Sequence, residues 1–153
     1  MKPRGWSSVL FAVCLLGPAC ASNASRGSSA SSLDILVEKL LDSPRAQQDT
    51  FESLVELGSE SIPALVGRLD DDRELLGQQL SVSSSRFPSY ENVAHYGPQT
   101  VHDALSLVLN GISHQSFIFV YNGSNRLERS ENSRAWRVWC REKFPVPADE
   151  CGY

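Results

Sequence analysis

Three histidines, His95, His102 and His114, have the side chains best suited to acid–base chemistry or metal binding near neutral pH. Two metal ligands on one helix face must lie about one turn apart, and no pair of these histidines has that spacing. His102 and Asp103 are sequence neighbours, and neighbours on a helix project to different sides. The histidines therefore predict neither a metal site nor a histidine–carboxylate pair.

Three consecutive carboxylates, Asp70, Asp71 and Asp72, raise the question of a calcium site. Calcium loops place their ligands on alternate residues around a central glycine, which adjacent carboxylates cannot do. We predict instead that they charge the start of a short helical turn at residues 73–79. The sequence also has no Gly-x-Ser-x-Gly turn and no glycine-rich phosphate loop. It predicts a protein that is not an enzyme and needs no cofactor.

The amino-terminal residues have the pattern of an export signal. Lys2 and Arg4 precede an apolar run over residues 9–16, and small residues follow up to Ser22. As a helix this run is about 12 Å long, too short for a hydrocarbon core of about 30 Å. We predict that residues 1–21 are a signal peptide and that the protein works outside the cytoplasm, secreted or in the periplasm.

Two processing outcomes are open at the end of the leader. Small residues at Ala19 and Ala21 suit cleavage before Ser22, which would release a soluble protein. A leucine pair shortly before Ala19-Cys20 resembles the leader of bacterial lipoproteins, and this resemblance implies acylation of Cys20. Membrane association is expected only through such a lipid anchor.

Residues 22–32 are predicted to be a disordered, serine-rich tether. They contain no apolar side chain larger than alanine, so they cannot bury enough surface to offset the entropy of ordering. A flexible chain of about a dozen residues would hold a folded domain on the order of 20 Å from a surface.

Two of the four cysteines, Cys14 and Cys20, belong to the leader or its end, which leaves Cys140 and Cys151 in the mature chain. An oxidising compartment lets such a pair join. We predict a disulfide that ties the proline-rich tail to the last helix. Two cysteines without a nearby histidine are not expected to bind a metal.

Charge argues against nucleic acid as a partner. The chain has 14 basic and 18 acidic residues, and removal of Lys2 and Arg4 with the leader leaves 12 against 18. Binding to phosphate backbones depends on clustered positive charge. The basic residues near the C-terminus alternate with Glu131 and Glu142, which predicts a solvated helix face: Arg134, Arg137, Arg141 and Lys143.

Hydrophobic periodicity predicts a single, mainly α domain over residues 33–153. The expected helices cover residues 33–41, 44–57, 61–69, about 97–112 and 131–143. Trp136 and Trp139 are expected to anchor the last helix to the core.

A short β-hairpin is predicted near the C-terminus. Residues 116–121 are rich in aromatic and branched side chains and precede Asn122-Gly123, a strong two-residue hairpin turn. Residues 124–127 would form the partner strand.

The second and third predicted helices form a hairpin that carries a motif. The helix over residues 44–57 ends in Leu57-Gly58, and the helix over residues 61–69 opens with Ile62-Pro63. Leu69-Asp70-Asp71 closes the unit. Over residues 45–71 this resembles a HEAT-type repeat. HEAT repeats are generally protein-binding scaffolds, so the resemblance implies a HEAT-like helical domain that binds protein. Arrays of this class usually contain three or more units, and one is found here.

Residues 81–97 lack a helical period but contain Phe87, Tyr90 and Tyr96. We predict that this segment lies over the helices and that these aromatic residues contact a partner.

The resulting hypothesis is an exported, non-catalytic protein-binding or scaffold domain. The alternatives are a small exported hydrolase, using His102 or His114, and a structural spacer of the cell envelope.

Overall fold

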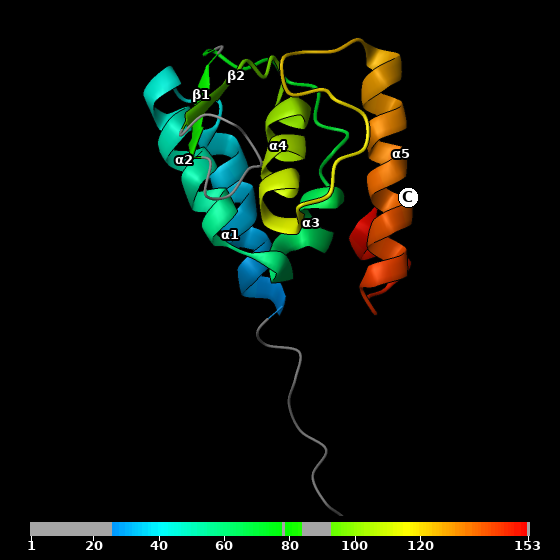
Figure 1. The fold of residues 1–153 in the computed structure, drawn as a ribbon. Coiled ribbons are helices and arrows are strands. Elements are labelled where there is room, and N and C mark those ends of the chain that lie inside the picture. Colours follow the sequence, from blue (N-terminus) through cyan, green and yellow to red (C-terminus); the bar gives the residue numbers. More distant parts are fainter. Residues whose placement is uncertain (1–25, 78, 84–92, 153) are drawn as a thin grey trace, which may run out of the picture.

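The computed structural model describes residues 26–77, 79–83 and 93–152. Its helices are α1 (Arg26–Lys39), α2 (Pro44–Glu56), α3 (Ile62–Val66), α4 (Val101–Ser113) and α5 (Arg126–Lys143), as Figure 1 shows. Two 3-10 turns, η1 (Ser59–Ser61) and η2 (Ala148–Cys151), and two antiparallel strands, β1 (Leu80–Ser83) and β2 (Val93–Tyr96), complete the described part. The predicted fold class, mainly α with a short β-hairpin, is confirmed.

Helix α4 lies at the centre of the fold, with α1 and α2 to one side and α5 to the other (Figure 1). It packs against α2 and α3, and every residue from Val101 to Leu109 is buried. Its leucine and valine side chains supply much of the apolar burial that stabilises a small domain. Three polar side chains are buried with them, His102, Asp103 and Ser106, and each must find hydrogen-bond partners inside the protein.

A capping box sets the start of α4. The Thr100 hydroxyl accepts from the Asp103 N–H at 3.4 Å, and the Asp103 carboxylate accepts from the Thr100 N–H at 3.2 Å. These bonds satisfy N–H groups that have no partner within the helix. The helix therefore begins at Val101 and not at the predicted Gly97-Pro98.

A second capping box shows why the hairpin predicted at residues 116–127 is wrong. Asn125 and Glu128 exchange hydrogen bonds of 2.9 and 3.0 Å, so α5 begins at Arg126 and not at residue 131. Residues 124–127, which were predicted to form the second strand, instead form this cap and the first turn of α5. Residues 114–125 instead form an irregular segment between α4 and α5.

The hairpin lies in the segment predicted to be irregular. Strand β1 pairs with β2 in the register Leu80↔Tyr96 to Ser83↔Val93. Leu80 and Val82 are buried, and the Gln48 amide of α2 pairs with both backbone groups of Ser81, at 3.0 and 2.9 Å. These contacts come from a distant helix, which explains why local sequence did not reveal the strand.

Helix α1 begins at Arg26, within the predicted tether of residues 22–32. The role of residues 22–32 as a tether stays a prediction. The buried residues Leu33, Val37 and Leu40 anchor the following turns, and extending an existing helix costs far less than starting one.

Two predicted helical segments are shorter or absent. Helix α3 ends at Val66, before the predicted Leu69. The described residues of 73–79 form no helical turn, because residues 71–75 run beside residues 99–102 and exchange backbone hydrogen bonds with them. This pairing satisfies the same backbone groups that a helical turn would have satisfied.

The predicted disulfide is present: Cys140 of α5 and Cys151 of η2 are bonded, with Cα atoms 6.0 Å apart. Both cysteines are buried, and η2 packs against α3 and α5. The bond therefore holds the C-terminal tail against the helices. Among the described helices, none is long and apolar enough to cross a membrane.

Candidate functional site

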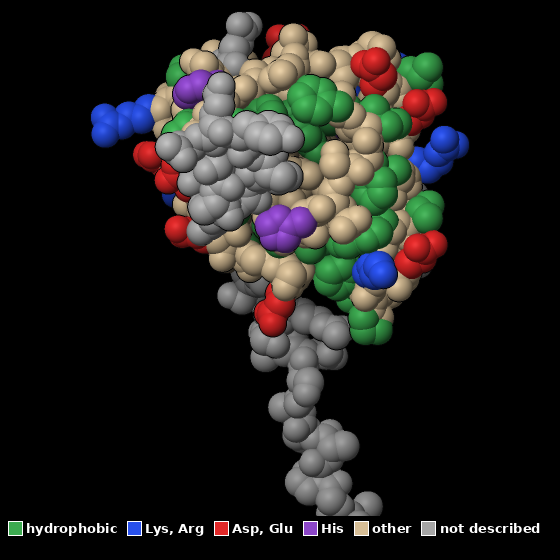
Figure 2. Space-filling model, in the orientation of Figure 1, with side chains coloured by type: hydrophobic (Ala, Val, Ile, Leu, Met, Phe, Trp, Pro, Cys, Tyr) green, Lys and Arg blue, Asp and Glu red, His purple; other side chains and the backbone are tan. Residues whose placement is uncertain are grey.

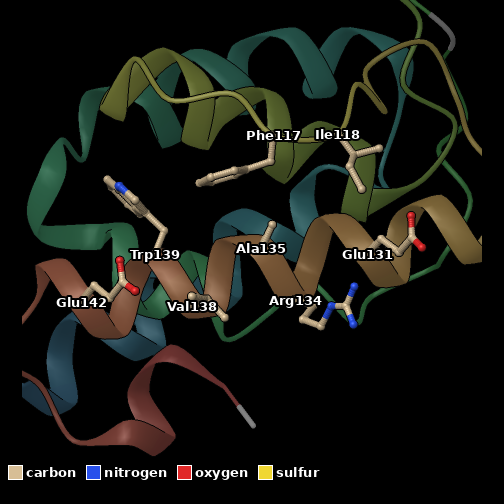
Figure 3. A pocket seen from close by; sticks show the side chains of 8 residues that line it. All are labelled: Phe117, Ile118, Glu131, Arg134, Ala135, Val138, Trp139 and Glu142. Atoms are coloured by element: carbon tan, nitrogen blue, oxygen red, sulfur yellow. The ribbon is translucent and has the colours of Figure 1, made fainter.

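An open apolar groove of about 520 Å³ runs along α5, beneath the segment that links α4 to α5. Figure 3 shows Phe117 and Ile118 reaching from that segment toward Ala135 and Trp139 of the helix. We call this surface the α5 groove. It is lined by Phe117, Ile118, Glu131, Arg134, Ala135, Val138, Trp139 and Glu142.

The helical contribution to the groove follows from sequence spacing. Its residues occupy positions 131, 134, 135, 138, 139 and 142, which is one continuous face over three turns of helix. The opposite face of α5 carries Trp136 and Cys140, which are completely buried. One side of the helix therefore anchors it to the core while another remains available at the surface.

Edge-to-face aromatic contacts support the groove from below. Trp136 lies 4.8 Å from Phe117 and 5.5 Å from Trp139, measured between ring centroids, and Trp139 lies 5.9 Å from Phe144. Such contacts have preferred geometries and hold large rings in place. The predicted core role applies fully to Trp136, whereas Trp139 is half-buried and also lines the groove.

A buried asparagine positions the wall of the groove. The Asn132 amide donates to the Ile118 carbonyl at 2.8 Å, and its oxygen accepts from the Ser106 hydroxyl of α4 at 2.9 Å. Asn132 thus connects α5, α4 and the linking segment through one side chain. Buried polar connections of this kind specify one arrangement, because any other would leave polar atoms unpaired.

The groove belongs to a patch of exposed apolar side chains. Phe117 is 36% exposed, Val138 46% exposed, and Phe119 of the same linking segment 59% exposed. Figure 2 shows hydrophobic side chains gathered on the right-hand part of the view, where α5 lies, with acidic and basic side chains at the outer edge. Apolar patches rimmed by charge are characteristic of surfaces that contact other molecules.

The charges at the rim are unevenly placed. Glu131 and Glu142 lie at opposite ends of the groove, and Arg134 lies between them in sequence, nearer to Glu131 (Figure 3). Glu131 and Arg134 are three residues apart on one helix, where opposite charges are neighbours. The end marked by Glu142 has no basic residue among those that line the groove, so it favours a cation.

Several residues selected from the sequence lie elsewhere. Phe87, Tyr90 and Cys20 fall outside the described residues. Tyr96 is half-buried on β2 and makes an edge-to-face contact with Tyr121, their centroids 5.8 Å apart. Tyr121 also contacts Phe119 at 4.9 Å, which connects Tyr96 to the apolar patch through one ring.

The structure does not bring the three histidines together. His95 on β2 lies 3.2 Å from the Ser81 hydroxyl, and His114 is the exposed, left-handed C-cap of α4. His102 is completely buried, and its Nδ1 lies 2.5 Å from the Leu69 carbonyl oxygen. Two hydroxyls near it are engaged otherwise: Ser133 donates to the same carbonyl, and Ser106 donates to Asn132.

Asp103 makes a buried ion pair in this region. Its carboxylate, completely buried, accepts from Arg129 Nε at 2.9 Å and from Nη2 at 3.1 Å, and also from the Gln99 N–H at 3.0 Å. Hydrogen bonds to this carboxylate raise the pKa of Arg129. The pair fastens α4 to α5, and neither the cap nor the pair was recognised from the sequence.

The burial of His102 predicts a loss of stability in weak acid. Burial lowers its pKa below the ordinary value of 6.5, despite the opposing effects of the Leu69 carbonyl, Asp103 and Asp72. Unfolded chains then take up a proton at a pH where the folded protein does not. The free energy of unfolding should therefore fall from pH 7 to pH 5, by at most about 1.4 kcal/mol per pH unit from this group.

Urea denaturation at several pH values tests this expectation. His102→Asn removes the titrating group while its amide can still donate to the Leu69 carbonyl, so the stability profile should become flatter. His114→Asn is the matched control, because asparagine tolerates the left-handed conformation at that C-cap. A profile that is equally steep in His102→Asn would contradict the assignment.

Within the described residues, no three histidine, cysteine, aspartate or glutamate side chains are placed to share a metal ion. The resemblance of residues 45–71 to a HEAT-type repeat stays a prediction. No protein-family model, curated protein or solved structure matches this chain.

Proposed function

We propose that this is an exported, non-catalytic binding protein whose α5 groove holds an amphipathic helix of a partner protein. The observation that carries the proposal is the exposed apolar face of α5 beside Phe117 and Phe119. Covering this face would remove apolar surface from water, which is the main favourable term in protein association.

The shape of the groove favours a helix as the occupant. Its floor offers residues at helical spacing over about 16 Å, and the ridges of a second helix fit between such rows. A partner helix would place apolar residues at positions i, i+3, i+4 and i+7 along Ala135 and Val138. Glu142 adds a charge preference, since a lysine or arginine of the partner beside it would complete an ion pair.

A designed peptide tests the groove directly. A cationic amphipathic helix with a leucine stripe and terminal lysines should bind the full mature chain, as measured by fluorescence anisotropy. Val138→Asp should weaken binding at least about tenfold, because it places a carboxylate in the apolar floor. Leu127→Asp is the matched control: Leu127 is 67% exposed on the same helix but does not line the groove, so binding should be unchanged.

Three outcomes would overturn the proposal. One is equal binding by the Val138→Asp and Leu127→Asp variants, and another is no preference for lysine over glutamate at the peptide ends. The third is concentration-dependent self-association that Val138→Asp abolishes, which would identify a second copy of the chain as the occupant.

The export part of the proposal is supported by residues 1–21 and by the disulfide, a bond that persists in oxidising compartments. A chain that begins at acylated Cys20 would be tethered to a membrane surface, whereas one that begins at Ser22 would be soluble. Either outcome is compatible with a binding protein that works at an extracytoplasmic surface.

The intact mass of the protein from its native host distinguishes these outcomes. We expect a mass that begins at Ser22, or at Cys20 with added acyl groups, and in both cases about 2 Da below the reduced form because of the disulfide. Digestion with and without reduction locates the bond. An unprocessed chain that retains Met1 and has free thiols at both Cys140 and Cys151 would contradict export.

A further inference from the structure

The two-stranded sheet has one covered edge and one open edge. Strand β1 lies next to α2 (Figure 1), and the Gln48 side chain of that helix pairs with both backbone groups of Ser81, at 3.0 and 2.9 Å. Gln48 thereby takes the place of a neighbouring strand at the outer edge of β1. On the outer side of β2, the backbone groups of Val93 and His95 have no such partner among the described residues. We call these groups the β2 edge.

The register of the hairpin shows that the groups of the β2 edge point outward. In an antiparallel pair, residue pairs that exchange hydrogen bonds alternate with pairs whose N–H and C=O groups point away from each other. Ser81 lies opposite His95, and both backbone groups of Ser81 point to Gln48. This pair is therefore of the second kind, and so is the pair of Ser83 and Val93 two positions along. The N–H and C=O groups of His95 and Val93 accordingly face away from β1.

The β2 edge has a defined end and no feature that blocks pairing. Two positions after His95, the Gly97 N–H donates to Asn122 Oδ1 at 2.8 Å, so the open stretch stops there. Val93 and His95 are both exposed. Open strand edges in proteins are usually protected by proline, by charged side chains or by a bulge. Strand β2 has the sequence Val-Ala-His-Tyr, which contains no proline, lysine, arginine or carboxylate.

We propose that the β2 edge pairs with the β2 edge of a second copy of this chain, in antiparallel orientation, to form a four-stranded sheet. With Ala94 on the two-fold axis, Val93 of each copy lies opposite His95 of the other. This register joins all the outward groups in four backbone hydrogen bonds. A strand of another protein would need free groups at the same spacing, whereas a second copy has them necessarily.

The side chains of β2 are compatible with this pairing. Ala94 meets its own copy across the axis, where opposite side chains come closest, and a methyl group fits there. Val93 lies opposite His95, so the two histidines do not face each other. A four-residue edge buries far less than the roughly 1,200 Å² of a stable interface, so we expect a weak dimer with a dissociation constant on the order of 1 mM or below. This interface is separate from the α5 groove and does not depend on the function proposed for it.

Analytical ultracentrifugation of the full mature chain, from about 10 µM to about 1 mM, tests the pairing. His95→Pro removes an outward N–H but no hydrogen bond between β1 and β2, and proline is accepted at such positions of edge strands. Self-association should therefore weaken at least about tenfold. His95→Thr is the matched control, since threonine favours strands and keeps the N–H, and it should associate like the unaltered chain. Val138→Asp should also associate normally, which distinguishes this dimer from association through the α5 groove.

Amide hydrogen exchange gives a second readout that needs no variant. In the monomer, the N–H groups of Val93 and His95 should exchange fast, because they have no acceptor, whereas that of Ala94 is protected by its pairing with Val82. Raising the protein concentration should slow exchange at Val93 and His95 in proportion to the fraction of dimer.

Two results would overturn the proposal. One is a chain that remains monomeric at about 1 mM, with exchange at Val93 and His95 independent of concentration. The other is self-association that is equally strong in His95→Pro and His95→Thr, because the N–H group of residue 95 would then take no part in it.

Discussion

Replacement of Asp103 by alanine is expected to lower the free energy of unfolding by about 3 to 5 kcal/mol, the largest effect that we predict for any single substitution in this protein. Asp103 is completely buried and accepts hydrogen bonds from Arg129 and from the backbone at the start of α4. Its removal leaves the Arg129 guanidinium, which is 13% exposed, without a partner. The cost comes mainly from this uncompensated charge.

Urea denaturation followed by tryptophan fluorescence measures the effect. Asp34→Ala is the matched control, since Asp34 also pairs with an arginine, Arg68, but is 61% exposed. Surface pairs contribute about 1 kcal/mol or less. A loss for Asp103→Ala that is no greater than that for Asp34→Ala would contradict the structural role of the buried pair.

A double-mutant cycle separates the pair from its surroundings. Arg129→Ala should also destabilise the protein, because the Asp103 carboxylate would then be buried without its countercharge. The double variant should lose less than the two single variants together, since neither partner is left as an isolated charge. Strict additivity would indicate that the two side chains do not act as a pair.

Removal of the disulfide is expected to cause the second large loss of stability. In the chain-entropy model a closed loop of about a dozen residues contributes about 3 kcal/mol, since the cross-link restricts the unfolded chain. Cys140 and Cys151 are separated by 11 positions, so the variant with both cysteines replaced by serine should lose about that amount. The tail that contains η2 should also become accessible to proteases, because its contacts with α3 and α5 no longer have covalent support.

Reduction of the unaltered protein provides the control for this experiment. Treatment with dithiothreitol should give nearly the same loss as the double serine variant, because both remove the same covalent constraint. A reduced protein as stable as the oxidised one would show that the remaining contacts of η2 are sufficient. The groove should still bind its peptide, since Phe117 and Val138 lie outside the disulfide loop.

Apolar spacing and the number of cysteines beyond the leader were informative in the sequence. The apolar spacing of residues 44–57 and 101–112 identified the buried faces of α2 and α4, and Ser43-Pro44 marked the start of α2. The pairing of Cys140 with Cys151 followed from their being the only cysteines beyond the leader. Each inference depended on residues within a few turns of one another, where spacing determines which side chains share a face.

The β-hairpin could not be located in this way. Residues 116–121 have the composition of a strand, but the Asn125–Glu128 capping box uses the residues that would have paired with them. Strand β1 is held by Gln48, which lies 33 positions away in the sequence. Pairing between strands depends on such distant contacts, and residue type alone predicts it poorly.

The candidate sites depended even more on tertiary structure. Arg134 and its neighbours were predicted to form a solvated helix face, and only the position of Phe117 above Ala135 turns part of that face into a groove. Composition and periodicity were sufficient for the buried faces of α2 and α4, the start of α2 and the disulfide pair, whose interactions are local. The groove is formed by segments distant in sequence, and the burial that brings these segments together arises only when the chain folds.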